Sequence, residues 1–166
     1  TYRKIAVVEN TLENYEAAIA ANKAVLALLE NTNDEDAYAA QLNNLGYSYQ
    51  KLGNNTEALR YFEKTLKKRE EQGFTDVQNM PLLINMGIAF QNLHNYAGAK
   101  KYLGRALDAS NTAVQKAAIY DLIAMAFLAE NDMVNAREYN RKSLEQASIS
   151  KDKRLEAEAH YTASII

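Results

Sequence analysis

The sequence predicts an all-α protein, a solenoid of antiparallel helix pairs, and three observations support this fold class. The chain has one Pro and six Gly in 166 residues, and 48 % of its residues are hydrophobic. A pattern of large, small, aromatic and Ala positions recurs at long intervals, and short polar turns separate the stretches that carry it. A unit of this kind cannot bury its apolar face alone, so stacked neighbours must complete the core.

The recurring pattern begins at Leu42, and further copies begin 41 and then another 37 residues later. In each copy the small residue of the first helix precedes the Ala of the second helix by 12 positions. A half-copy at residues 14–18 matches residues 95–99, so the array starts before Leu42. The three copies read Leu42-x2-Leu45-Gly46-x2-Tyr49 with Ala58-x3-Phe62, Leu83-x2-Met86-Gly87-x2-Phe90 with Ala99-x3-Leu103, and Tyr120-x2-Ile123-Ala124-x2-Phe127 with Ala136-x3-Asn140.

This pattern resembles the tetratricopeptide repeat, in which the helix pairs wind into a right-handed superhelix. Gly46 is expected where two helix backbones approach closely, with Ala58 as the matching small residue on the second helix. The spacings of 41 and 37 residues exceed the length of about 34 of the common repeat. The pattern is therefore similar to the long-repeat branch found in kinesin light chain, polarity scaffolds and bacterial peptide-sensing regulators. Asn140 replaces an expected aromatic residue, which makes the third copy the least typical.

Polar breaks predict where each helix begins and ends. Thr32 and Glu35 have the spacing of a capping box, and Asn55 or Thr56 is expected to cap the following helix. Pro81 suits a first helical turn, so residues 74–80 are expected to form the longest connection. The helices are predicted at about 2–10, 13–30, 34–52, 55–72, 81–93, 95–109, 112–130, 132–148 and from Ser150 or Asp152 to 166.

These helices form a single array over residues 1–166. It is expected to hold a partial repeat at about 1–30, full repeats at about 34–72, 79–109 and 112–148, and a partial repeat at about 150–166. The chain starts with Thr1 and ends on an apolar edge, so we expect it to be a fragment of a longer protein.

Composition argues against several classes of function. The net charge of −2 offers no electrostatic footprint for nucleic acid or an anionic membrane, and no apolar run is long enough to span a bilayer. Cysteine is absent, and His94 and His160 lack partners at metal-ligand spacing, so no metal or cofactor is expected. No catalytic constellation is visible, which predicts a protein that is not an enzyme. A cytoplasmic location is weakly favoured.

The resemblance implies a concave face that is lined by the first helix of each pair. Asn44 and Asn85 are equivalent there, and an amide complements a peptide backbone because it offers both donors and an acceptor. The alternative is that both are solvated polar residues on an unused surface. The candidate peptide-binding residues are Asn43, Asn44, Tyr47, Gln50, Lys51, Ile84, Asn85, Ile88, Gln91 and Met125, beside Asn92, Asp121, Leu122 and Leu128.

The predicted function is a non-catalytic scaffold that binds a protein or an extended peptide along this face. The alternative is a regulatory, sensor or oligomerisation region of a larger signalling protein, such as a sensor kinase or a transcription regulator. The sequence leaves the partner and the oligomeric state open. The regularly spaced Tyr47, Tyr61, Tyr102 and Tyr139 are expected to pack between neighbouring helix pairs more often than to bind a ligand.

Overall fold

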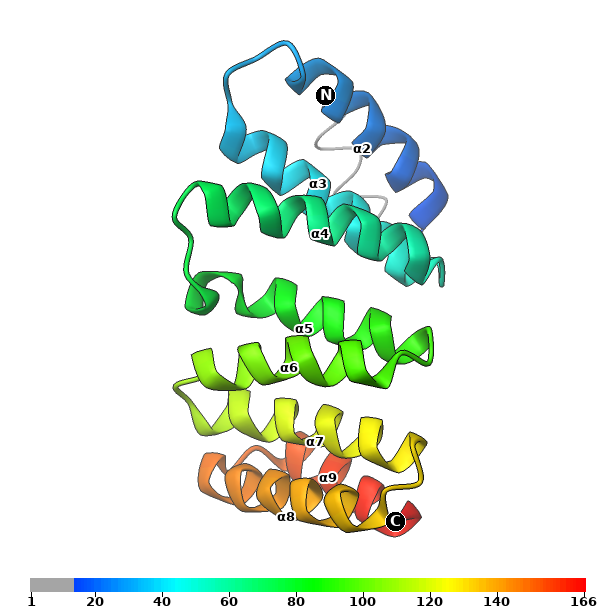
Figure 1. Cartoon of the computed structure of the whole chain (residues 1–166), viewed down its shortest axis with the longest axis vertical. Helices are drawn as coiled ribbons and strands as arrows, with labels where there is room; N and C mark the ends of the chain where they lie inside the picture. Colours follow the sequence, from blue (N-terminus) through cyan, green and yellow to red (C-terminus); the bar gives the residue numbers. More distant parts are fainter. Residues whose placement is uncertain (1–13) are drawn as a thin grey trace. The chain divides into compact units, whose positions relative to one another are not determined.

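A computed structural model describes residues 14–166, and this part of the chain is helical throughout, without a strand (Figure 1). Contacts divide the chain into an N-terminal unit that ends at Thr75 and a C-terminal unit that begins at Asp76. The N-terminal unit contains α2 (Tyr15–Leu29), α3 (Glu35–Lys51) and α4 (Asn55–Glu71). The C-terminal unit contains α5 (Asp76–Asn92), α6 (Tyr96–Ala109), α7 (Ala113–Ala129), α8 (Met133–Ser150) and α9 (Lys153–Ile165). The predicted all-α class is confirmed.

Side-chain oxygens accept hydrogen bonds from first-turn N–H groups and so determine where the helices begin. Two predicted caps were wrong. Thr32 does not form a capping box, because its hydroxyl donates to the Leu29 carbonyl at 2.9 Å, while the Asp34 carboxylate, a stronger acceptor, caps α3. Asn54, rather than the residue after it, caps α4. The observed N-caps are Asn14, Asp34, Asn54, Asn95, Thr112, Asp132 and Asp152.

The turn inside each helix pair requires one residue with a left-handed backbone. Gly53 takes this conformation between α3 and α4, with a φ of 83°. His94 and Asn131 occupy the equivalent positions in the next two pairs, with φ values of 57° and 60°. Because a side chain with a Cβ rarely adopts such angles, the tight connection itself imposes this conformation.

The core of the N-terminal unit lies between α2, α3 and α4, around Leu42 and Tyr61. Gly46 is buried in α3, and a Cβ added there would lie 2.5 Å from the ring of Phe62. The fully buried Phe62 ring of α4 therefore fills the space directly beside Gly46. A glycine is needed here because a larger residue would collide with the large side chain of the opposite helix.

The C-terminal unit repeats this arrangement and extends it. A Cβ on Gly87 of α5 would lie 2.6 Å from Leu103 of α6. Helices α7 and α8 form the next antiparallel pair (Figure 1), and α9 packs against both of them. A cluster of Ala117, Ala147 and Leu155 joins these three helices.

The start of α5 differs from the prediction. The helix begins at Asp76, so Pro81 lies inside it, and residues 74–80 are not the long connection that was expected. Pro81 removes the N–H that would bond to the carbonyl four residues earlier. Asp76 holds this extra turn, because its carboxylate accepts hydrogen bonds from Arg105 of α6 at 2.9 and 2.6 Å. The same pairing lowers the pKa of Asp76.

Candidate functional site

The five candidate residues of the N-terminal unit lie on one face of α3, as their spacing predicted. The Tyr47 side chain is exposed, and the Lys51 ammonium lies 5.4 Å from the centre of its ring. This distance permits a cation–π contact. Asn43, Asn44 and Gln50 are partly buried beside this pair. The face therefore offers an aromatic surface, a cation and amide groups.

Asn43 and Asn44 differ in their surroundings. The Asn43 side-chain oxygen is buried and has no hydrogen-bond partner among the described residues. The Asn44 carbonyl accepts a hydrogen bond from the Ser48 hydroxyl at 2.9 Å. This contact involves the backbone of Asn44 and not its side-chain amide.

The candidate residues of the C-terminal unit lie on α5 and α7. Ile84, Asn85 and Ile88 are partly buried on α5. The Gln91 amide donates a hydrogen bond to the Leu122 carbonyl of α7 at 2.7 Å. Gln91 therefore connects the first helices of two successive pairs, a structural role that the sequence did not reveal.

Met125 continues this face toward α9. Its side chain is 37 % exposed, and its sulfur lies 3.8 Å from the Thr162 hydroxyl. By repeat register, Thr162 stands where Asn44, Asn85 and Leu122 stand in the earlier first helices. Within the C-terminal unit, α5, α7 and α9 are thus linked side by side along one face.

Asp121 lies on α7, and its surroundings shift the pKa of its carboxyl. Burial raises the pKa of the Asp121 carboxyl, a hydrogen bond from Thr162 opposes the rise, and Glu158 of α9 adds to it. One Asp121 oxygen is buried without a hydrogen-bond partner among the described residues. The carboxylate form is therefore poorly solvated, and protonation would relieve this.

Two buried asparagines connect neighbouring pairs. Asn140 of α8 donates to the Ala159 carbonyl of α9 at 2.8 Å, and the two residues are 19 positions apart. Asn22 of α2 contacts Gln41 of α3, also 19 positions away, and donates to the Ser48 hydroxyl at 3.3 Å. The sequence marked Asn140 only as a missing aromatic. Asn22 occupies the equivalent repeat position in α2, and this recurrence of Asn in the sequence could have indicated a hydrogen bond to the next pair.

Of the regularly spaced tyrosines, Tyr47 is exposed, whereas Tyr61, Tyr102 and Tyr139 each stack on another ring. The ring centres of Tyr49 and Tyr61 lie 5.5 Å apart, with planes only 9° from parallel. The equivalent pairs are Phe90 with Tyr102 at 5.4 Å and Phe127 with Tyr139 at 5.3 Å. Each ring pair joins the two helices of one pair, which corrects the expectation that these tyrosines pack between neighbouring pairs.

Other classes of site gain no support from the described residues. This part of the chain has no cluster of three His, Cys, Asp or Glu side chains placed to bind a metal. The His94 ring nitrogen lies 2.9 Å from the Tyr96 hydroxyl, so His94 belongs to a surface turn. None of the helices from α2 to α9 is long and apolar enough to cross a membrane.

Comparison with known sequences gives a partial match to one repeat family and one relative. Residues 1–71 match the model described as "Tetratricopeptide repeat". Over 95 residues the chain is 32 % identical to anaphase-promoting complex subunit 8 of Arabidopsis thaliana. That alignment covers 57 % of this chain and 16 % of the relative, so the chain spans about a sixth of that protein's length.

Solved structures with similar folds cover nearly the whole chain. BtubC from P. vanneervenii has a TM-score of 0.76 at 16 % identity, over 99 % of this chain and 72 % of that one. MamA has a TM-score of 0.68 at 20 % identity, over 97 % and 91 % of the two chains. A putative kinesin light chain from Podosopora anserina, with nearly identical TPR-like repeats, has a TM-score of 0.70 at 12 % identity, over 99 % and 92 %. At these identities the likeness concerns the fold, an all-α solenoid of helix pairs.

Proposed function

Since this chain is a tetratricopeptide-repeat protein, we propose that it is a non-catalytic scaffold that binds an extended peptide on its first helices. Tetratricopeptide repeats in general mediate interactions between proteins. The finer proposal assigns the contact to the α3 face in the N-terminal unit and to the α5 and α7 face in the C-terminal unit.

The exposed Tyr47 beside Lys51 is the observation that carries this proposal. An exposed aromatic side chain offers a large contact area at a low cost in conformational entropy, and Asn44 on the same face offers an amide for a peptide backbone. In the C-terminal unit, Ile88 and Met125 offer apolar contacts for peptide side chains. This mixture of amide and apolar groups favours a peptide over a strongly charged ligand.

The alternative function, a regulatory, sensor or oligomerising region of a larger signalling protein, stays a prediction. It is compatible with peptide binding, because a peptide bound on these helices could act as the signal.

The test combines Asn44→Ala with Asn85→Ala. Peptides that bind the parent protein are first selected from a random dodecapeptide library, and their affinities are then measured by isothermal titration calorimetry. A peptide bound on either unit should lose one hydrogen bond of about 0.5–1.5 kcal/mol, which weakens its binding by roughly 2- to 13-fold. The melting temperature should stay close to that of the parent.

The matched control replaces two exposed asparagines outside the helices, Asn33→Ala with Asn111→Ala. The control should bind the selected peptides as the parent does. If Asn44→Ala with Asn85→Ala also keeps full affinity, these asparagines are ordinary surface residues and the proposed face is wrong.

A further inference from the structure

A second surface lies on the opposite side of α3. Tyr38 and Tyr47 are nine residues apart, about two and a half helical turns, so they point in opposite directions. Tyr38 and Leu42 line a pocket of about 340 Å³, whose other lining residues come from α4. We call this the lysine pocket, and it is lined by Tyr38, Leu42, Lys64, Lys67, Lys68 and Glu71.

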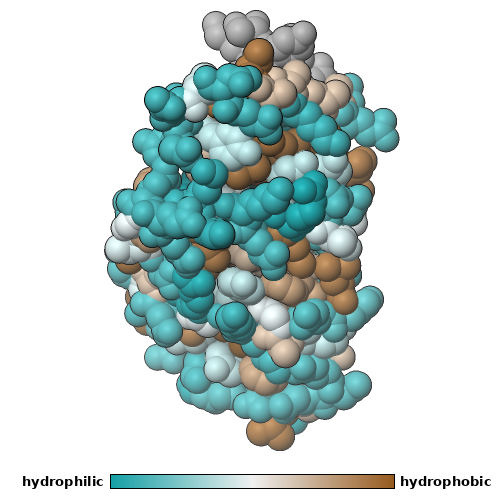
Figure 2. All heavy atoms as spheres, turned by 45° about the horizontal axis from the view of Figure 1, so that its top comes forward, coloured by the Kyte–Doolittle hydropathy of each residue, from teal (hydrophilic) through white to brown (hydrophobic). Residues whose placement is uncertain are grey.

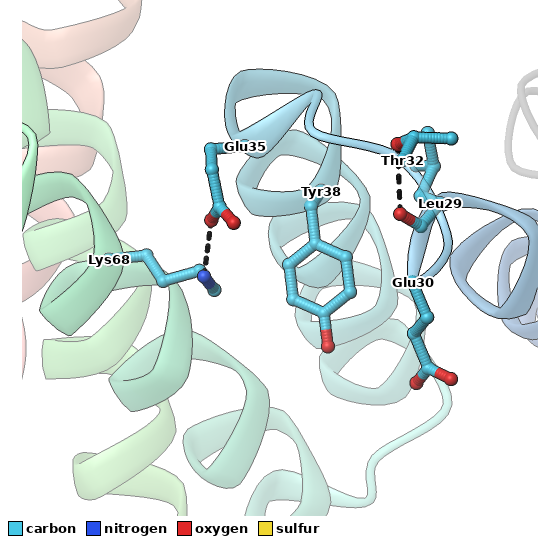
Figure 3. A pocket seen from close by; sticks show the side chains of 6 residues that line it. All are labelled: Leu29, Glu30, Thr32, Glu35, Tyr38 and Lys68. Carbon is cyan, nitrogen blue, oxygen red and sulfur yellow. Dashed lines mark hydrogen bonds and ion pairs between the residues drawn. The ribbon is translucent and has the colours of Figure 1, made fainter.

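A smaller pocket of about 180 Å³ adjoins the lysine pocket, because the two share Tyr38 and Lys68. Figure 3 shows the Tyr38 side chain between Lys68 on one side and Glu30 on the other. Lys68 forms an ion pair with Glu35, and its ammonium lies 5.1 Å from the centre of the Tyr38 ring. Tyr38 and Lys68 therefore line both pockets, within the N-terminal unit.

The lysine pocket has an excess of positive charge. Three of its six lining residues are lysines, and Glu71 is its one carboxylate. Lys64 is exposed and has no ion pair among the described residues. Lys67 is 80 % exposed and 3.9 Å from Glu71, a pair that contributes little in water. Two cations are thus available at the rim, above a floor made by Tyr38 and Leu42.

This charge pattern is specific to α4. Positions 64, 67 and 68 correspond to 105, 108 and 109 in α6 and to 142, 145 and 146 in α8. Arg105 is bound to Asp76, and Lys142 lies 3.4 Å from Glu138. The remaining equivalents are Asp108, Ala109, Glu145 and Gln146. The repeat itself does not require lysines at the last two positions, because α6 and α8 fold with acidic or neutral residues there, while the basic residue at the first position is paired with a carboxylate in both helices.

We propose that the lysine pocket binds a short acidic segment of a partner protein, with one apolar side chain on Tyr38 and Leu42 and carboxylates on Lys64 and Lys67. Figure 2 shows mostly hydrophilic side chains on one face of the molecule, with hydrophobic ones scattered between them. At the lysine pocket, charge complementarity supplies selectivity and fast association, while the apolar side chain on Tyr38 and Leu42 holds the segment in register.

The probe is a fluorescein-labelled dodecapeptide of alternating Glu and Asp with one central Leu. Its affinity for the whole chain is measured by fluorescence anisotropy at low and at physiological salt. Lys64→Glu with Lys67→Glu should weaken binding at least about tenfold, because both carboxylate contacts become repulsive. Added salt should weaken binding to the parent, since both cations are exposed. Replacing the central Leu by Gly should weaken binding about fivefold or more.

The matched control makes the same charge change elsewhere, with Lys101→Glu and Lys153→Glu, two exposed lysines of the C-terminal unit. It should change the affinity less than twofold. The Asn44→Ala and Asn85→Ala variant should bind this probe as the parent does, so failure of one proposal is separable from failure of the other. Thermal melting followed by circular dichroism checks that each variant is folded.

Three outcomes would overturn the proposal. The first is that the parent fails to bind the probe at millimolar peptide. The second is an equal loss of affinity in the reversal and control variants, which would indicate attraction by net charge alone. The third is binding of a phosphoserine peptide but not of the carboxylate probe, which would assign the pocket to phosphorylated partners.

Discussion

One position in the second helix of each pair is filled in two ways. In α4 and α6 it carries Phe62 and Leu103, which lie over Gly46 and Gly87 of their own pairs. In α2 and α8 the same position carries asparagines, Asn22 and Asn140, which form hydrogen bonds to the first helix of the following pair. All of these side chains are 4 % exposed or less.

The comparison shows that one repeat position can serve two contacts. An apolar side chain there fastens the second helix to its own partner by packing into the space above a small residue. An amide side chain there packs less apolar surface and instead forms a hydrogen bond to a carbonyl or hydroxyl of the next helix. We expect the first arrangement to contribute more to stability.

The largest expected effect tests this difference directly. Phe62→Ala should lower the free energy of unfolding by about 3–5 kcal/mol, because it removes a fully buried ring and leaves a cavity over Gly46. Asn140→Ala should lower it by only about 0.5–1.5 kcal/mol, because it removes one hydrogen bond. Urea denaturation followed by circular dichroism measures both values. An Asn140 variant as destabilised as the Phe62 variant would reverse the proposed order.

A second prediction compares two glycines of the same helix, one that lies against an aromatic ring and one that does not. A Cβ on Gly98 of α6 would lie 2.7 Å from Phe90, whereas a Cβ on Gly104 would meet nothing within 4 Å. Gly104→Ala should stabilise the protein by about 0.5–1 kcal/mol through helix propensity. Gly98→Ala gains the same propensity, but it should be less stable than Gly104→Ala by about 1–3 kcal/mol because of overpacking. Equal thermal shifts for the two variants would show that the Phe90 ring moves aside freely.

The smallest expected effect concerns Asp121, which lies close to the contact between α7 and α9. Burial raises the pKa of this carboxyl in the folded state, so the folded protein holds the proton more tightly than the unfolded chain does. The free energy of unfolding should therefore fall as the pH rises from the ordinary Asp pKa of about 3.9 to the raised folded value. Asp121→Asn should remove this fall. Urea denaturation of both proteins across that pH range measures it, and parallel stability curves would contradict it.

The fold was predictable because its main signals are local and periodic. The constant interval from Gly46 to Ala58 and its equivalents predicts which helices pair. Pro81 was misleading, because a Pro most often marks a first turn, whereas here an ion pair between Asp76 and Arg105 holds an additional turn before it.

The candidate site was predictable only in part. Helical spacing placed Tyr47 and Lys51 on one side of α3, as the structure has them. The hydrogen bond from Gln91 to the Leu122 carbonyl depends on the distance between two helices and on a rotamer, and neither can be read from the sequence. The lysine pocket was missed for the same reason, because its lining residues come from two helices.

The stacked ring pairs give this protein its own optical probe. The chain contains eleven tyrosines and no tryptophan, so the tyrosine band of its near-ultraviolet circular dichroism is free of indole signals. Each stacked pair includes at least one tyrosine from the second helix, held nearly parallel to a ring of the first helix. Loss of that band therefore reports loss of fixed packing around the tyrosines, including those between paired helices, whereas the far-ultraviolet band reports the helices themselves. Comparing the two bands during unfolding distinguishes undocking of pairs from melting, without a label or a substitution.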